Sequence, residues 1–296
     1  MPDLAGILER LEPTLGPLSG EPVPLDGGIT NHNYRVRFGE RDCVVRFPGK
    51  DTDQLGIDRE AEWLAASEAA RLGIGPALIH ADAHCAVTAF VDARPIDPEA
   101  LWADPAAVAR ALRSFHDSPL ELPSRFWVPE LLAQYAGLVT QAGRALPSAY
   151  ERTQALVERI AARLPLSDPV PCHNDLLAGN LLVGAGGVML VDWEYAGMGH
   201  HLFDLGNLAV NNDFDAPAED RLLGAYFGAP PSDGRQAALA LMRIMSDARE
   251  AAWGVIQSVI SELDFDFDAY ASKHFERLHA KASEPAFDEW LASARP

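Results

Sequence analysis

The chain has 296 residues, 48% of them hydrophobic and 23% charged, which is enough apolar side chain for one large domain or two smaller ones. Acidic residues outnumber basic ones by 43 to 24, and the net charge of -19 would repel a nucleic acid or an anionic membrane surface. A negative field favours the approach of a cationic ligand instead, although solubility alone is a sufficient reason for it.

Cysteine spacing and hydropathy argue against a disulfide-rich, a zinc-binding and a membrane-spanning protein. The three cysteines, Cys43, Cys85 and Cys172, lack CxxC spacing and indicate neither a disulfide framework nor a zinc site. No stretch approaches the roughly 18 apolar residues of a membrane-spanning helix, and the N-terminus lacks the apolar segment of a leader. We therefore expect a cytoplasmic monomer or homodimer with no nucleic-acid partner and no stable membrane association.

The first third of the chain predicts a small antiparallel sheet with one helix. Strand-like runs with tight turns between them, and one Ala- and Glu-rich helix that ends at Gly73, cover residues 34–38, 42–47, 58–72, 77–80 and 85–91. Pro95 and Pro98 then interrupt the pattern, so we place a boundary between residues 92 and 93.

The remaining two thirds are mainly helical by periodicity. Helices are predicted over residues 104–116, 129–143, 148–164, 219–227, 236–260 and 266–279. Two short apolar strands, 180–183 and 188–191, interrupt this series on either side of a glycine-rich turn. The fold class is therefore α+β, with a sheet-bearing first part and a mainly helical second part.

The residues around this second hairpin have the composition of a phosphoryl-transfer site. His173 to Asn180 has the form HxDxxxxN, and Asp192 follows the apolar strand directly. Transfer to an alcohol requires a carboxylate that accepts the hydroxyl proton, and Asp175 suits that role. It also requires hard oxygen ligands for magnesium, and Asn180 and Asp192 suit that one.

Each of these residues has a structural alternative. Asp175 is compatible with a turn, Asn180 with a strand edge and Asp192 with a cap. Their occurrence together in an otherwise apolar segment favours catalysis. His173 we interpret as support for the loop, because a lone histidine beside a strand more often holds a loop than transfers protons.

On these residues the chain resembles the choline and ethanolamine kinases, within the aminoglycoside-phosphotransferase-like enzymes. The resemblance implies a protein-kinase-like fold, with a nucleotide-binding lobe over residues 1–92 and a catalytic and acceptor-binding lobe over residues 93–296. It implies Asp175 as the base, Asn180 and Asp192 as magnesium ligands, and ATP as the phosphoryl donor. Residues 203–207 match the FDxxN segment of the family, so Asp204 is expected to support the catalytic loop; an N-cap for the next helix is the alternative.

The resemblance also implies the nucleotide contacts. Residues 27–34 match the GGxxNxxY turn that covers the phosphates, with Gly28, Thr30 and Asn31 nearest to them. Arg46 stands where protein kinases have a phosphate-binding lysine. Its expected ion-pair partner is Glu62, with Glu60 as the competitor. Phe90 and Val91 fall at the interlobe segment that presents backbone groups to adenine.

The acceptor pocket is implied by the C-terminal segment 253–270, which is similar to the segment that walls the pocket in choline kinases. The aromatic residues Tyr195, Trp253, Phe265 and Tyr270 would hold a quaternary ammonium through their faces. Asn211 stands where some members have an acid, so the negative charge would come from Asp213, Asp215 or Glu250, and Glu250 itself replaces a family tryptophan.

The predicted function is transfer of the γ-phosphoryl group of ATP to the hydroxyl of choline, a small cationic alcohol. The same chemistry with ethanolamine, an aminoglycoside or another amino alcohol is the first alternative, since carboxylates in the pocket favour primary amines. The second alternative is a catalytically silent binding protein on a kinase scaffold; the presence of the base and both metal ligands argues against it.

Overall fold

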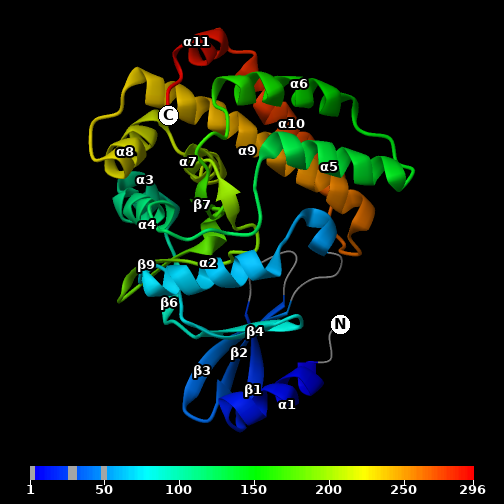
Figure 1. The fold of residues 1–296 in the computed structure, drawn as a ribbon, viewed down its shortest axis with the longest axis vertical. Helices are drawn as coiled ribbons and strands as arrows, with labels where there is room; N and C mark the ends of the chain where they lie inside the picture. The colour runs from blue at the N-terminus through cyan, green and yellow to red at the C-terminus, as the bar shows by residue number, and fades with distance from the viewer. Residues whose placement is uncertain (1–3, 26–31, 48–51) are drawn as a thin grey trace.

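The computed structural model describes residues 4–25, 32–47 and 52–296, and shows a sheet-bearing lobe joined to a larger helical lobe (Figure 1). The N-terminal lobe contains an antiparallel sheet in the order β1-β2-β3-β5-β4. Its strands are β1 Leu18–Leu25, β2 His32–Phe38, β3 Arg41–Phe47, β4 Leu78–Asp82 and β5 Cys85–Ala89. The four strands predicted from the sequence correspond to β2 to β5, and β1 adds an edge strand.

Helix α1 (Leu4–Leu15) covers one face of this sheet. Its Leu8, Leu11 and Leu15 are buried with Val36, Val45 and other strand residues in a core of their own. This helix and β1 are absent from the sequence prediction. β1 contains two prolines and mostly exposed side chains, which an edge strand tolerates because its outer N–H groups have no ladder partner.

Helix α2 (Arg59–Arg71) lies between the sheet and the helical lobe (Figure 1). It begins at Asp58, whose carboxylate accepts hydrogen bonds from Glu60 N at 2.9 Å and Ala61 N at 3.2 Å. The helix contributes Ala61, Ala65 and other small residues to the core of the larger lobe.

We expect Asp58→Ala to lower the free energy of unfolding by about 1 kcal/mol, because the first-turn N–H groups of α2 lose their acceptor. Urea denaturation of the variant measures this loss. Asp58→Asn retains an acceptor and should restore most of it, whereas equal stability of the alanine variant and the wild type would show that the cap is not needed.

The C-terminal lobe is mainly helical. It contains α3 Pro98–Ala103, α4 Ala106–His116, α5 Val128–Gln141, α6 Ser148–Arg163, α7 His201–Asn211, α8 Ala216–Phe227, α9 Asp233–Ile260, α10 Phe267–Ala282 and α11 Ala286–Ser293. Two short sheets, β6-β8-β9 and β10-β7, use β6 Ala93–Pro95, β7 Val170–Cys172, β8 Leu181–Gly184, β9 Gly187–Leu190 and β10 Gly197–Gly199. Single 3-10 turns lie at Thr52–Leu55 and Ala178–Asn180.

The predicted helix over residues 104–116 corresponds to α4, whereas the short helix α3 before it is absent from the sequence prediction. Asp97 caps α3, and Pro98 occupies its first turn, where the missing N–H of proline has no partner to lose. Pro98 therefore begins a helix rather than interrupting the pattern, and α4 follows after Pro105. The boundary between residues 92 and 93 stays a prediction; Ala93 begins β6, which pairs with β8.

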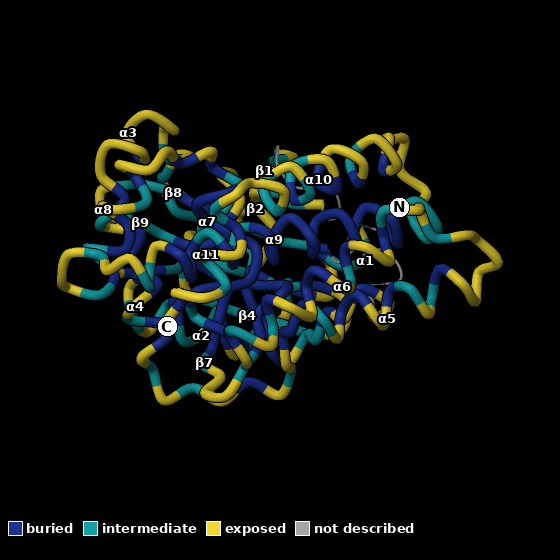
Figure 2. The backbone as a smooth tube through the Cα atoms, turned by 90° about the horizontal axis from the view of Figure 1, so that it is seen from above, coloured by how far each residue is buried: buried dark blue, intermediate teal, exposed yellow. Residues whose placement is uncertain are grey.

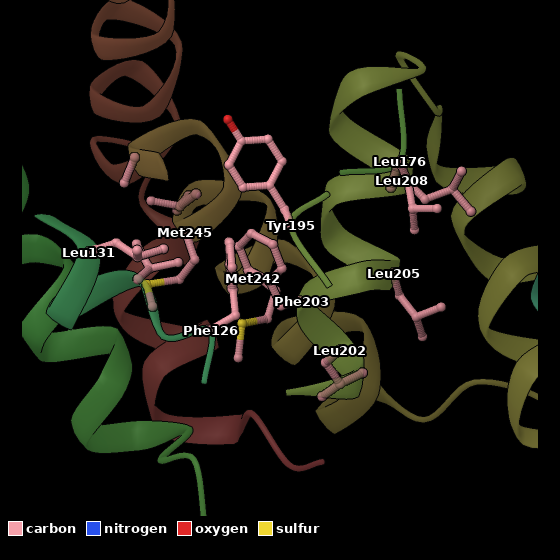
Figure 3. Close-up of a cluster of buried hydrophobic side chains, with 14 of the residues drawn as sticks. Phe126, Leu131, Leu176, Tyr195, Leu202, Phe203, Leu205, Leu208, Met242 and Met245 are labelled. Carbon is pink, nitrogen blue, oxygen red and sulfur yellow. The ribbon is translucent and has the colours of Figure 1, made fainter. Parts of the chain in front are cut away.

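Helix α9 is the centre of the C-terminal lobe. It packs against α5, α6, α7, α10 and α11, and Figure 2 shows it as a largely buried tube. Figure 3 shows Met242 and Met245 of this helix in one cluster with Phe203 of α7 and with Phe126. The centres of the Phe126 and Phe203 rings lie 5.1 Å apart. A Cβ at Gly206 would lie 2.6 Å from the Met242 carbonyl carbon, so glycine there permits the close approach of α7 to α9.

Cys43, Cys85 and Cys172 are free and buried. No helix within the described ranges is both long and apolar enough to cross a bilayer.

Candidate active site

A cavity of about 460 Å³ opens between the sheet and the β8–β9 hairpin, a size typical of a small-molecule site. Apolar side chains from both lobes, Val44, Leu78, Val91 and Leu182 among them, line it. Polar groups from three separate segments, Arg46, Glu62, Asn180 and Asp192, also line it. We call this cavity the interlobe cleft.

Arg46 on β3 connects the two lobes inside the cleft. Its Nη1 lies 3.1 Å from Glu62 Oε1, and its Nη2 lies 2.7 Å from Asp192 Oδ1 and 2.9 Å from Glu194 Oε2. Burial alone would lower the pKa of Arg46, but the three carboxylates raise it above its ordinary value. The structure therefore places Glu62 against Arg46, whereas Glu60 is exposed on the same helix.

The loop after β7 is held by buried hydrogen bonds from α7. Asp204, which is 0% exposed, accepts from His173 N at 2.8 Å and from Asn174 N at 2.7 Å. Asn207 accepts from Leu176 N at 2.5 Å. Three backbone N–H groups on the two sides of Asp175 are thus fixed by α7, and Asn174 adopts a left-handed backbone with φ of 66°.

Asp204 also lies 3.0 Å from His116 Nε2 on α4. It sits inside α7, whose N-cap is His200, so the alternative that Asp204 caps the helix is wrong.

His173 is buried and its ring supports the loop. Asp175 N donates to His173 Nδ1 at 3.3 Å, and His173 Nε2 lies 3.0 Å from Val191 O. These partners require a neutral ring with the proton on Nε2. Burial lowers the pKa of His173, which favours the same form.

Asp175 itself is 7% exposed at the inner side of this loop. Burial raises the pKa of Asp175 well above its ordinary range; Arg249 opposes this shift, and Glu250 and Asp192 add to it. A carboxyl with a raised pKa is a stronger proton acceptor than a free one, which suits a general base near neutral pH.

Asn180 and Asp192 have a donor set that fits magnesium. Asn180 Nδ2 donates to Asp175 O at 2.8 Å, which leaves the amide oxygen for another contact. Asp192 has a left-handed backbone with φ of 67°, directly after β9, and both residues line the cleft. Asp192 Oδ1 is buried 2.7 Å from Arg46 Nη2, and carboxylate and amide oxygens are the hard ligands that magnesium prefers, so Asn180 and Asp192 fit a divalent cation.

Aromatic residues gather on the other side of Asp175, away from the cleft. Trp253 Nε1 donates to the Tyr195 hydroxyl at 2.8 Å, and the Trp253 and Tyr270 rings lie 5.6 Å apart. The Tyr270 hydroxyl donates to Glu250 Oε2 at 2.8 Å. Phe265 is 41% exposed and stands at the rim, with its ring 6.0 Å from Tyr270. We call Tyr195, Trp253, Tyr270 and Glu250 the acceptor wall.

Comparison with known proteins decides the family. Residues 21–241 match the model of the phosphotransferase enzyme family. The chain belongs to the phosphotransferase enzyme family. It is 24% identical to probable choline kinase 1 of Arabidopsis thaliana, over 93% of this chain and 88% of the relative.

Two solved structures confirm the protein-kinase-like fold of this phosphotransferase. The choline/ethanolamine kinase family protein of Mesorhizobium loti superposes with a TM-score of 0.83, at 30% identity over 98% of both chains. LicA in complex with AMP gives a TM-score of 0.74, at 25% identity over 97% of this chain and 98% of the other. The phosphotransferase is thus an alcohol-acceptor kinase with a two-lobed α+β fold.

The structure says less about the other residues that were predicted to bind the nucleotide. Gly28, Thr30 and Asn31 lie outside the described residues. Phe90 and Val91 line the cleft, but Phe90 N donates to Asp42 O at 2.9 Å and Arg35 covers the Phe90 ring at 3.7 Å. Within the described ranges Val91 N has no acceptor, so Val91 is the better placed of the two to present a backbone group.

Asn211 ends α7 and is half-buried. It forms no hydrogen bond to the acceptor wall among the described residues. Asn212 instead donates to Leu176 O at 3.1 Å and holds the catalytic loop. Of the candidate acids, Asp215 caps α8 and Asp213 lies 3.8 Å from Arg277, whereas Glu250 is part of the acceptor wall.

Two further residues beside the Asp175 loop, Asn207 and Arg249, are not among the site residues predicted from the sequence. Asn207 fixes Leu176 and donates to Ser246 Oγ at 2.9 Å, which joins the loop to α9. Arg249 on α9 lies 3.4 Å from Asp175 Oδ1 and is 2% exposed. Its signal in the sequence is a charged pair, Arg249 and Glu250, inside an otherwise apolar and alanine-rich helix.

Proposed function

We propose that this phosphotransferase transfers the γ-phosphoryl group of ATP to the hydroxyl of a small amino alcohol. One observation carries the proposal: the buried Asp175 contacts Asn180, which lines the cleft, and Arg249, which packs on the Tyr195 ring of the aromatic wall. A nucleotide and an acceptor bound on the two sides would meet at this carboxylate.

In the proposed reaction the acceptor oxygen forms a bond to the γ-phosphorus, and the hydroxyl proton passes to Asp175. The bond between the γ-phosphorus and the bridging oxygen breaks, and its electron pair leaves with ADP. Asn180 and Asp192 would hold magnesium, which supplies charge neutralisation at the phosphates when bound. Asp204 and Asn207 keep the Asp175 loop in place throughout.

We assign residues 1–92 to nucleotide binding and residues 93–296 to catalysis and acceptor binding. In this assignment Arg46, held by Glu62, contacts the phosphates, and Val91 contacts adenine. The solved complex of LicA with AMP supports a nucleotide in the equivalent fold. The cytoplasmic location and the monomeric or dimeric state stay predictions.

For the acceptor, choline and ethanolamine remain the two main candidates. Tyr195, Trp253 and Tyr270 favour the methylated ammonium of choline, because aromatic faces attract a cation that cannot donate hydrogen bonds. Glu250 favours the primary ammonium of ethanolamine, which can donate to it. An aminoglycoside or a different amino alcohol is the broader alternative.

Magnesium-dependent ADP formation across a panel of alcohols tests the proposal. We expect turnover with at least one small amino alcohol and none after chelation of divalent cations with EDTA. Higher kcat/KM for choline than for ethanolamine would support the aromatic argument, and the reverse order would support Glu250. ADP formation that no acceptor stimulates would contradict the proposed function.

A further inference from the structure

The acceptor side of Asp175 contains a buried guanidinium that the proposed reaction does not use. Arg249 Nη1 lies 2.8 Å from Glu250 Oε1 and 3.4 Å from Asp175 Oδ1. The guanidinium carbon stands 4.2 Å from the centre of the Tyr195 ring. Arg249 therefore occupies the surroundings that the sequence analysis assigns to a cationic acceptor.

The other edge of this guanidinium has no partner. Arg249 Nε and Nη2 are buried and meet no hydrogen-bond acceptor in the described part of the chain. A buried cationic donor without an acceptor is unfavourable, so these two N–H groups require an acceptor from outside the described residues.

The same chain shows what such an edge binds. Arg35, Arg71 and Arg277 each use Nε and Nη2 together to hold one carboxylate. The Arg277 pair lies 2.8 Å and 2.6 Å from oxygens of Asp247, and the Arg71 pair lies 2.7 Å and 2.6 Å from those of Glu68. This is the fork geometry in which a planar guanidinium matches a carboxylate. Arg249 presents the same fork with no carboxylate in it.

The groups of the acceptor wall that could bind a cation, Glu250 and the Tyr195 ring, already have partners within the protein. Glu250 accepts from Arg249 through Oε1 and from Tyr270 through Oε2. One face of the Tyr195 ring is covered by the guanidinium. A cationic ligand would have to compete with the Arg249 guanidinium for Tyr195 and Glu250. An anionic pair of oxygens could instead accept from Arg249 Nε and Nη2, which meet no acceptor among the described residues.

An acceptor carboxylate suits the fork better than an ATP phosphate does. Arg249 does not line the interlobe cleft, which has Arg46 for the phosphates. It contacts Tyr195 and Glu250, on the acceptor side of Asp175.

We propose that the acceptor alcohol carries a carboxylate next to its amino group, and that Arg249 binds this carboxylate through Nε and Nη2. This inference rests on the proposed kinase function and narrows its substrate class to short hydroxylated zwitterions. The hydroxyl and the carboxylate must be only a few bonds apart, because Arg249 and Asp175 are in contact.

Matched acceptors test the inference. L-serine is ethanolamine with a carboxylate added beside its amino group, and N,N,N-trimethyl-L-serine is choline with the same addition. We expect kcat/KM for at least one carboxylated compound to exceed that of its partner by about 10-fold or more, as a bidentate charged contact allows. Arg249→Met should remove this preference: kcat/KM of the carboxylated member should fall about 10-fold further than that of its partner, because any loss through the contact of Arg249 with Asp175 is common to both compounds. Arg159→Met, which changes an exposed arginine paired with Asp288, is the matched control and should leave the preference unchanged.

Because Arg249→Met leaves Glu250 without its ion-pair partner, the double variant Arg249→Met with Glu250→Met provides a second test in which this unpaired carboxylate is absent. The inference is overturned if choline or ethanolamine is the better substrate in both pairs. It is also overturned if Arg249→Met leaves the ratio of the two kcat/KM values unchanged, since Arg249 then acts only through Asp175 or the phosphoryl group.

If no alcohol is turned over, the proposed function fails, and calorimetry of L-serine and ethanolamine binding decides the inference separately. Binding of serine that exceeds that of ethanolamine in the wild type and is lost in both Arg249 variants would support it. Equal binding of the two compounds would overturn it.

Discussion

Replacement of Asp175 with alanine is expected to lower kcat by about 10²- to 10⁴-fold, the usual contribution of a positioned general base. The carboxylate is 7% exposed at the inner side of a loop held by Asp204 and Asn207, so solvent would not readily take over its role. ATP binding should persist, because Arg46 and the apolar lining of the cleft are unchanged. Steady-state ADP release and calorimetric titration with ATP measure the two effects.

Asp175→Asn tests the same role with less change in packing, since it removes the charge and keeps the shape. Asp168→Ala, an exposed aspartate at the entrance to β7, is the control and should retain full activity. Turnover near the wild-type rate in either Asp175 variant would remove this residue from the mechanism.

The pH dependence of activity should report the same group. Burial raises the pKa of Asp175, and only the deprotonated form accepts a proton. Activity should therefore rise with pH through this raised pKa and fall below it. In Asp175→Asn the residual rate should no longer rise with pH over this range. A rise that persists in the variant would have to come from another residue.

Replacement of Asp204 with alanine should destabilise the protein by about 3–5 kcal/mol, because it breaks a buried charged hydrogen-bond network. The substitution leaves His173 N, Asn174 N and His116 without their shared acceptor in a fully buried place. Each unpaired buried group contributes about 1–3 kcal/mol to the loss. Urea denaturation measures the effect, and kcat should fall as well because the Asp175 loop loses its anchor.

The exposed pair formed by Arg159 and Asp288 offers a control for this prediction. Asp288→Ala removes an ion pair of 2.9 Å at the surface and should change stability by less than about 1 kcal/mol. A comparably small loss in Asp204→Ala would show that water replaces the missing carboxylate.

Acid should weaken the same network. Burial alone would raise the pKa of Asp204, but the contacts with His116 and the His173 N–H lower it below its ordinary value. A carboxyl with a lowered pKa in the folded state contributes stability above its unfolded pKa, and this contribution is lost as pH falls through the folded one.

Local sequence patterns predict much of this fold, because most of its helices and strands have their turn, cap or stop residues at the ends that the structure shows. The apolar runs at 180–183 and 188–191 lie on either side of a glycine-rich turn, and the structure has the hairpin β8–β9 there, with bounds that differ by one residue at each end. Helix α2 has a cap at Asp58 and a stop at Gly73, and its observed bounds follow them closely. Edge strand β1 lacks such signals, because its prolines and exposed side chains resemble a loop.

The catalytic loop is also readable from the sequence, whereas the acceptor side is only partly so. Asp175, Asn180 and Asp192 belong to one short segment, so their proximity follows from a single hairpin. Arg249 and Asp175 are 74 residues apart, and their contact depends on how α9 packs beneath the loop. Spacing alone likewise leaves Glu60 and Glu62 equivalent, and the rotation of α2 against β3 separates them.

Helix α9 contributes both to the support of the Asp175 loop and to the acceptor wall. Ser246 joins it to the catalytic loop through Asn207, and Arg249, Glu250 and Trp253 follow within the next two turns. If the proposed function holds, the side chains that contact the acceptor project from the same helix that anchors the loop of Asp175. Substitutions at 249 and 250 should then change which alcohol is preferred while Ser246 and Asn207 keep that loop in place.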